Sequence, residues 1–95
     1  MKSEEFIKKA KTLVYNYTIM NIDCKSQIPE VYLVWYAFEL GNSKALLSTN
    51  ISDGMYYEVT YNANKNEIYL DAYKKTKNIV YSPDLVAADN IKASY

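Results

Sequence analysis

The chain has 95 residues, and its lysines and acidic residues, eleven of each, give a formal net charge of zero; histidine and arginine are absent. A chain of this length forms one domain, residues 1–95, and an apolar content of 49% indicates a folded protein. Without a net positive charge or guanidinium groups, binding to nucleic acid is disfavoured.

Few side chains are suited to catalysis or to metal binding. Cys24 is the single cysteine, and without a histidine to activate it we expect a passive thiol and no metal site. The two glycines are too few for a phosphate-binding loop, so we expect no cofactor. These absences predict a protein that is not an enzyme.

The N-terminus and the hydropathy pattern predict the compartment. Met1–Glu5 carries acids where a signal peptide has basic residues, and no apolar run approaches the length of a membrane span. We expect a soluble, unprocessed cytoplasmic protein without a membrane partner.

The first predicted element is an amphipathic helix from Ser3 to about Met20. Apolar residues recur there at spacings of three and four, namely Phe6, Ala10, Leu13, Tyr17 and Met20, widened by Ile7 and Val14. Burial of each large apolar side chain contributes roughly 1.5–3 kcal/mol, so this stripe is expected to dock on a sheet.

Four strands are predicted after a polar connection. Val31–Leu40 is apolar at both parities, as in a strand covered on both faces. Gly41-Asn42 is predicted as a two-residue turn that sets Glu39 opposite Lys44, and Asp53-Gly54 marks the next turn. The other predicted strands are Ser43–Asn50, Met55–Tyr61 and Glu67–Tyr73.

The C-terminal part is predicted to add a short edge strand and a short helix. Ile79–Tyr81 follows a lysine-rich segment that would protect such an edge, and Ser82-Pro83-Asp84 is typical of a helix start before Leu85–Lys92. The predicted fold is therefore α+β, with an N-terminal amphipathic helix packed on an antiparallel four- to five-stranded meander and a short C-terminal helix.

Strand alternation divides the last predicted hairpin into two faces. The face predicted as core carries Tyr57, Val59, Tyr61, Ile68, Leu70 and Ala72, and the other carries Tyr56, Glu58, Thr60, Tyr69, Asp71 and Tyr73. Two registers agree with this division. We favour the one that pairs Tyr61 with Asn66, because pairing Asn62 with Glu67 would set Glu58 opposite Asp71.

The second face is the candidate partner-binding surface, because one helix cannot cover both sides of the sheet. Its residues are Tyr56, Glu58, Thr60, Tyr69, Asp71 and Tyr73, with tyrosines as anchors and polar groups for specificity. Alternatively, it is a solvated face whose tyrosines only stabilise the hairpin, or a surface covered by a second copy or by the C-terminal helix. Acid–base chemistry by Glu58 and Asp71 is disfavoured without histidine.

Two further hypotheses about the function remain open. The lysine clusters Lys8, Lys9 and Lys11 and Lys74, Lys75 and Lys77 would suit a nucleic-acid-associated accessory protein. A self-associating structural module, such as a homodimer, is the other alternative.

Two sequence blocks, Asp53-Gly54-Met55-Tyr56-Tyr57 and Tyr69-Leu70-Asp71-Ala72-Tyr73, together with Lys44–Thr49, resemble a family of short uncharacterised proteins from Gram-positive bacteria and their phages. The likeness covers roughly residues 4 to 81; this chain has Ala63 where the family often has glycine, and the tail from Ser82 falls outside the pattern. The resemblance carries no activity and no catalytic residue.

What the resemblance implies is a setting, because small phage proteins commonly bind and disable host machinery. We therefore expect a phage-borne protein-binding module in the host bacterial cytoplasm. It would inhibit a host or defence protein, for example as an anti-CRISPR, by occlusion rather than by catalysis.

Overall fold

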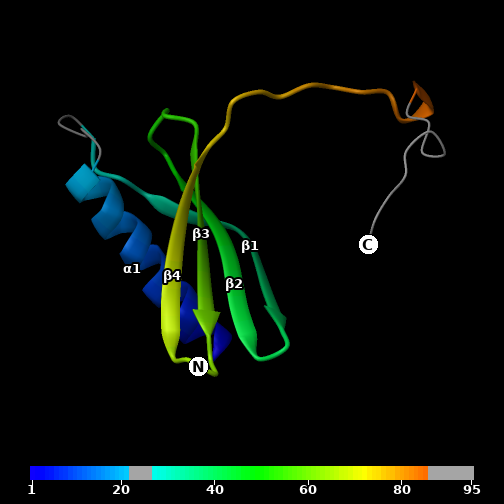
Figure 1. Ribbon diagram of the computed structural model, residues 1–95. Coiled ribbons are helices and arrows are strands. Elements are labelled where there is room, and N and C mark those ends of the chain that lie inside the picture. Colours follow the sequence, from blue (N-terminus) through cyan, green and yellow to red (C-terminus); the bar gives the residue numbers. More distant parts are fainter. Residues whose placement is uncertain (22–26, 86–95) are drawn as a thin grey trace.

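One helix and one antiparallel sheet make up the computed structural model, which describes residues 1–21 and 27–85 (Figure 1). The four strands lie in the order β1-β2-β3-β4, so each strand pairs with its neighbour in sequence. This meander with an N-terminal helix confirms the predicted α+β fold. The elements are α1 (Ser3–Asn21), β1 (Val31–Glu39), β2 (Asn42–Thr49), β3 (Met55–Asn62), β4 (Glu67–Lys74) and the 3-10 turn η1 (Pro83–Leu85).

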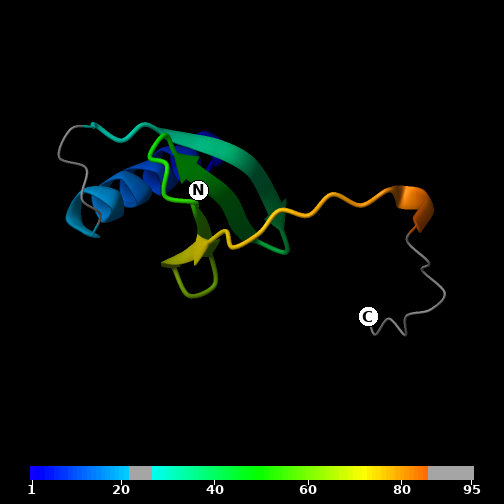
Figure 2. The same cartoon turned by 90° about the horizontal axis from the view of Figure 1, so that it is seen from above.

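The core lies between α1 and one face of the sheet (Figure 2). Its fully buried apolar side chains are Phe6, Ala10, Val14, Ala45, Leu47, Tyr57 and Val59. The helix contacts β1, β2 and β3, which places it over the middle of the sheet and toward β1. Pairs of aromatic rings contribute to this packing. The ring centroids of Phe6 and Tyr36 of β1 are 5.9 Å apart, and those of Tyr17 and Tyr57 of β3 are 5.7 Å apart in an edge-on arrangement.

The buried row of α1 differs from the predicted stripe. Every fourth residue is buried, from Phe6 through Ala10 and Val14 to Thr18, whereas Leu13 is 36% exposed and Met20 is 82% exposed. Residues four apart lie on one inclined row of a helix surface, and this row follows the sheet. Thr18 escaped prediction because its hydroxyl marks it as polar.

A β-bulge in β1 explains why this strand is apolar at both parities. Leu33 pairs with Leu47 and Trp35 with Leu46, so Val34 is an extra residue with no partner position on β2. The extra residue reverses the alternation, and both Leu33 and Tyr36 pack against the core. The assumption of strict alternation along Val31–Leu40 was therefore wrong.

The turn between β1 and β2 comprises Leu40 and Gly41 rather than Gly41 and Asn42. Glu39 pairs with Asn42, and both turn residues have positive φ, 53° at Leu40 and 80° at Gly41. Positive φ at both positions of a two-residue loop is typical of the I′ turn, whose twist suits a hairpin. The predicted pairing of Glu39 with Lys44 is wrong, because Lys44 lies opposite Ala37.

Two hydrogen bonds join the loop between β2 and β3 to the segment before β1. The Asn50 side-chain oxygen accepts the Glu30 amide at 2.8 Å, and the Asn50 amide donates to the Glu30 carbonyl at 3.1 Å. As predicted, Asp53 and Gly54 lie at the turn into β3; the Asp53 carboxylate accepts the Met55 amide, and Gly54 has a φ of 71°.

The β3–β4 hairpin adopts the register that we had disfavoured. Asn62 pairs with Glu67, and Glu58 therefore lies opposite Asp71. The turn accounts for this choice: Asn66 takes a φ of 52°, which asparagine tolerates, and the Asn62 side chain accepts the Lys65 amide at 3.2 Å. Favourable turn geometry thus outweighs one like-charge pair.

The C-terminal part departs from the prediction. Ile79–Tyr81 forms no strand and all three residues are exposed, so the sheet has four strands rather than five. Ser82 precedes the short turn η1, in which the Leu85 amide donates to the Ser82 carbonyl at 3.0 Å. The predicted helix Leu85–Lys92 lies outside the described residues apart from Leu85. In residues 1–21 and 27–85, no helix has the length and apolar character that a bilayer crossing needs.

Leu40 provides a test of the first hairpin turn. This residue is 93% exposed and holds a positive φ that disfavours a branched side chain, so Leu40→Asn should stabilise the fold by about 1 kcal/mol. Chemical denaturation of both proteins measures the difference. Ile28→Asn is the matched control, because Ile28 is 78% exposed and lies outside the helix and the sheet. Equal effects of the two substitutions would contradict the turn assignment.

Candidate functional site

The sheet face opposite α1, here called the outer face, holds the six residues predicted as a partner surface. In β3 and β4 they form three cross-strand pairs, namely Tyr56 with Tyr73, Glu58 with Asp71 and Thr60 with Tyr69. Tyr69 is 40% exposed and Tyr73 is 53% exposed, although each is a large aromatic residue. The structure therefore brings all six side chains onto one accessible surface.

Residues of β1 and β2 extend this face across the whole sheet. Pairing runs from Trp35 through Leu46 and Glu58 to Asp71, and directly opposite residues of a sheet share a face. Trp35 is 40% exposed, and Leu46 is half-buried beside it. Trp35 was missed because the bulge at Val34 hid the parity of β1. Leu46 lies on the regular strand β2, and alternation along that strand could have placed it on this face.

A shallow hollow lies on the outer face beside Trp35. Its volume is about 430 Å³, and it is lined by Trp35, Ala37, Glu39, Leu40, Asn42, Lys44 and Thr60. The tryptophan ring and the aliphatic stem of Lys44 give it apolar walls, while Glu39 and Thr60 add polar groups.

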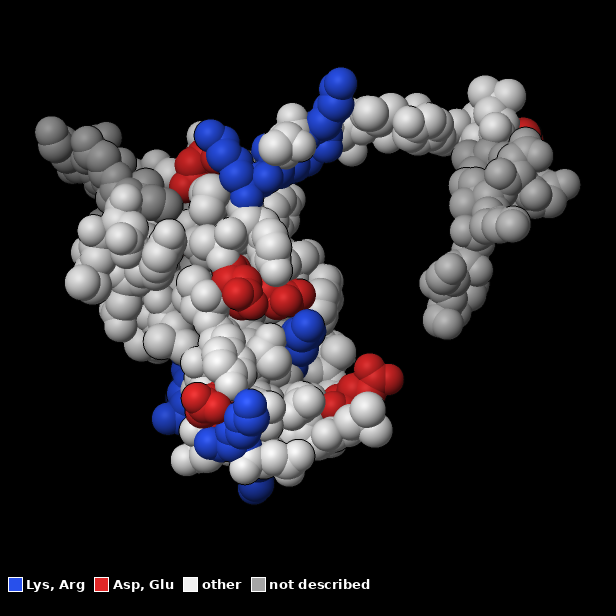
Figure 3. Space-filling view, in the orientation of Figure 1, with Lys and Arg blue, Asp and Glu red and all other residues white. Residues whose placement is uncertain are grey.

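The charges of the outer face are only partly balanced. The ammonium of Lys44 lies 3.4 Å from the Glu58 carboxylate, which compensates one member of the Glu58–Asp71 pair. Figure 3 views this face and shows acidic and basic atoms meeting near its middle among mostly uncharged side chains. The face thus presents carboxylate groups within an aromatic surround.

The Tyr69 hydroxyl is hydrogen-bonded to Glu67, a further acidic residue. Its hydroxyl donates to the Glu67 carboxylate at 2.9 Å, and this hydrogen bond, with smaller contributions from desolvation and the charge of Glu67, raises the pKa of Tyr69 above its usual value. Loss of the proton would leave two negative groups together. Loss of the proton from the Tyr69 hydroxyl is therefore less favourable than in an isolated tyrosine.

The other candidate groups are dispersed. Lys9 lies beside Ile68 near the start of β4, whereas Lys74 and Lys75 lie at the far end of that strand, so the two lysine clusters are separated by its length. Among the described residues, no group of three or more potential metal ligands comes together. Cys24 lies outside the described residues.

Comparison with known proteins assigns the chain to a family but not to an activity. Residues 7–83 match the family of unknown function DUF6275, and because this match spans most of the sequence, the chain belongs to that family. No curated protein and no solved structure matched significantly. This match confirms the predicted resemblance to a family without an assigned function.

The Glu58–Asp71 pair gives a testable effect on stability. Asp71→Asn removes a charge directly opposite Glu58 and should raise the free energy of unfolding by about 0.2–1 kcal/mol at low salt. Denaturation at low and high ionic strength measures this gain, which screening should reduce. Asp84→Asn, on an exposed turn away from the sheet, is the matched control. A gain that is independent of salt would contradict the electrostatic explanation.

Proposed function

We propose that this member of the DUF6275 family is a small phage-borne module that binds a bacterial host or defence protein and inhibits it by occlusion. A CRISPR effector is one such target, and the site of action is the host cytoplasm. The outer face is the contact surface. The protein needs neither a cofactor nor a catalytic step for this role.

The observation that carries the proposal is the exposed aromatic surface of the outer face. Tyr56, Tyr69 and Tyr73 project from β3 and β4, and Trp35 projects from β1. Tyrosine and tryptophan are enriched at the energetic centres of protein interfaces, because they bury large apolar rings and still offer a hydrogen-bonding group. Single exposed aromatics are ordinary, but three exposed rings on one face, Trp35, Tyr69 and Tyr73, with the half-buried Tyr56 beside them, favour recognition.

Polar groups among these rings supply specificity. Asp71 faces Glu58 and can accept hydrogen bonds from a cationic partner group, while Thr60 and the Tyr69 hydroxyl offer neutral contacts. A partner with basic residues over Asp71 would also relieve the repulsion within the pair. An aromatic centre with such groups around it has the composition of a protein interface.

The phage setting rests on the two sequence blocks that resemble short proteins of Gram-positive bacteria and their phages. The Asp53–Tyr57 block leads into β3, and the Tyr69–Tyr73 block lies in β4. Together these blocks contain Tyr56, Tyr69, Asp71 and Tyr73 of the outer face. The most specific part of the resemblance therefore coincides with the proposed contact surface.

Photo-crosslinking tests the contact surface directly. A photoreactive phenylalanine analogue at Tyr69 should capture a discrete host protein, and the same analogue at Tyr15 on α1 should not, because Tyr15 lies away from the outer face. Mass spectrometry identifies the captured protein. Capture from Tyr15 alone would place the contact on the helix side instead.

Substitution of the tyrosines measures their contribution to binding. Combined Tyr56→Ala, Tyr69→Ala and Tyr73→Ala should weaken binding of the captured protein at least about a hundredfold in calorimetry, because aromatic anchors dominate interface energies. Leu46→Lys should also weaken binding while leaving every tyrosine in place, and Tyr15→Ala is the control. Thermal unfolding verifies that each variant folds. Unchanged affinity in both outer-face variants would refute the assignment.

Occlusion and catalysis differ in stoichiometry. An occluding protein inhibits its target only up to one bound molecule per site, and activity returns after dissociation. A titration of the target's own activity should therefore show an equivalence point rather than progressive loss. Complete inactivation at strongly substoichiometric amounts would indicate an enzyme.

A further inference from the structure

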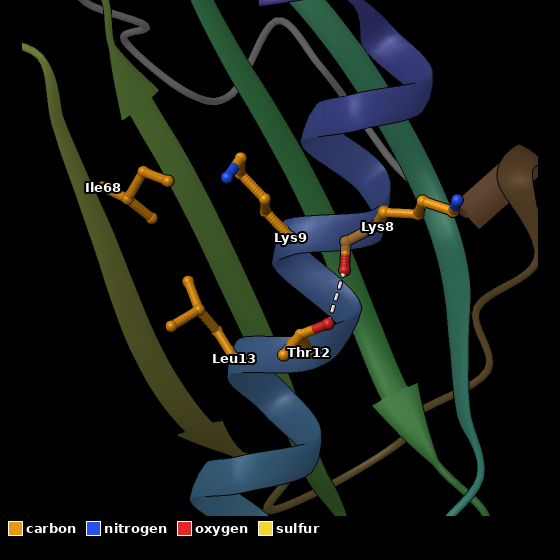
Figure 4. A pocket seen from close by; sticks show the side chains of 5 residues that line it. All are labelled: Lys8, Lys9, Thr12, Leu13 and Ile68. Atoms are coloured by element: carbon orange, nitrogen blue, oxygen red, sulfur yellow. Dashed lines mark hydrogen bonds between the residues drawn. The ribbon is translucent and has the colours of Figure 1, made fainter.

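A groove remains between α1 and β4 on the core side of the sheet. It has a volume of about 650 Å³ and is lined by Lys8, Lys9, Thr12, Leu13 and Ile68 (Figure 4). The close-up shows Leu13 from the helix and Ile68 from β4 on its two sides, with Lys9 extending between the elements. The helix packs mainly on β1, β2 and β3, which leaves the apolar side chains of β4 only half covered.

The strand that borders this groove is an open edge of the sheet. All eight residues of β4 pair with β3 on one side in an uninterrupted register, and β4 is last in the strand order. Its range Glu67–Lys74 contains no proline and no bulge, which are devices that protect an edge. The opposite edge, β1, carries the bulge at Val34. Of the two edges, β4 is the better acceptor for another strand.

The segment that follows β4, residues 75–85, is here called the arm. Each of its residues is exposed, and it extends away from the sheet in both views (Figures 1 and 2). Its centre is a run of three residues with high strand propensity: Ile79, Val80 and Tyr81 are 54%, 88% and 68% exposed. The family match reaches residue 83, so the arm belongs to the shared unit of the family.

We infer that two copies of this chain exchange their arms, so that Ile79–Tyr81 of each copy adds to the open β4 edge of the other as a fifth strand. In an antiparallel arrangement Ile79 lies opposite Ala72 and Tyr81 opposite Leu70. Both side chains then face the core side: Tyr81 lies next to the apolar groove at Ile68, and Ile79 lies farther along β4 against Ala72, while Val80 points to the outer face.

The same register within one chain is disfavoured by its turn. It would make Lys75-Thr76 a two-residue hairpin loop, in which the first position needs positive φ in both common turn types and the second needs it in type I′, so that neither lysine nor β-branched threonine is well suited. The Lys75 amide is moreover held by the Gly54 carbonyl at 2.7 Å, on the side of β3. An arm that continues to a second copy needs no reversal. Exchange of an identical element is a common route to dimers.

This inference is independent of the proposed function. The added strand occupies the β4 edge and the core-side groove, whereas Tyr56, Tyr69 and Tyr73 stay accessible on the outer face. A dimer of this kind would carry two outer faces. Failure of the arm exchange would therefore leave the host-protein proposal intact, and the reverse also holds.

Sedimentation of the full chain and of two matched variants tests the exchange. The natural chain should be a dimer that dissociates on dilution. Ile79→Lys with Tyr81→Lys should raise the dimer dissociation constant at least about tenfold, because both side chains face the apolar core side of the β4 edge and Tyr81 lies next to the groove that Lys9 borders. Val80→Lys should leave the dimer in place, because Val80 points outward and faces Asp71. Far-UV circular dichroism verifies folding, which these exposed positions should not disturb.

Disulfide trapping separates exchange between chains from closure within one chain. On a Cys24→Ser background, an equimolar mixture of Ala72→Cys and Ile79→Cys chains should give a covalent dimer on oxidation, since paired cross-strand positions allow a disulfide. A mixture with Val80→Cys in place of Ile79→Cys should not. A strictly monomeric chain, a dimer insensitive to the Ile79 and Tyr81 substitutions, or a closed monomer formed by Ala72→Cys and Ile79→Cys in one chain would overturn the inference.

Discussion

One row of buried side chains packs α1 against β1, β2 and β3. The row consists of Phe6, Ala10, Val14 and Thr18. The position of this helix determines what the rest of the sheet exposes. Because one helix of 19 residues covers one face, most side chains of opposite parity remain at least partly accessible, including Trp35 and the three outer tyrosines. Its offset toward β1 also leaves β4 half covered, and the groove beside Ile68 follows from that offset.

Alternation in β3 and β4 could be predicted because each strand is regular. Tyr57 and Val59 are buried in the core while Tyr69 and Tyr73 are exposed, as the period of two requires. The candidate site in these strands was therefore readable from the sequence. The extension of this face to Trp35 could not be predicted, because no local sequence pattern indicates the extra residue at the Val34 bulge.

Turns and register were harder to predict because several weak energies compete. The Leu40-Gly41 turn places a leucine at positive φ, against its intrinsic preference, and tertiary pairing overrides that cost. In the β3–β4 hairpin, one like-charge pair decided the predicted register. In the structure, the Lys44 ammonium compensates the charge of Glu58, and the observed register allows the favourable turn with Asn66 at positive φ. A single cross-strand contact of a few tenths of a kcal/mol is too small to fix a register.

The bulge at Val34 has a consequence for length variation. Residues Leu33 and Trp35 pair with consecutive positions of β2, so removal of Val34 would leave a regular strand with the same residues on each side. Val34 is 45% exposed at the edge of the sheet, where the removal leaves no buried gap. Deletion of Val34 from β1 would therefore leave the pairing with β2 and the aromatic side chains of the outer face in place. Related chains that are one residue shorter at this point would keep the same surface.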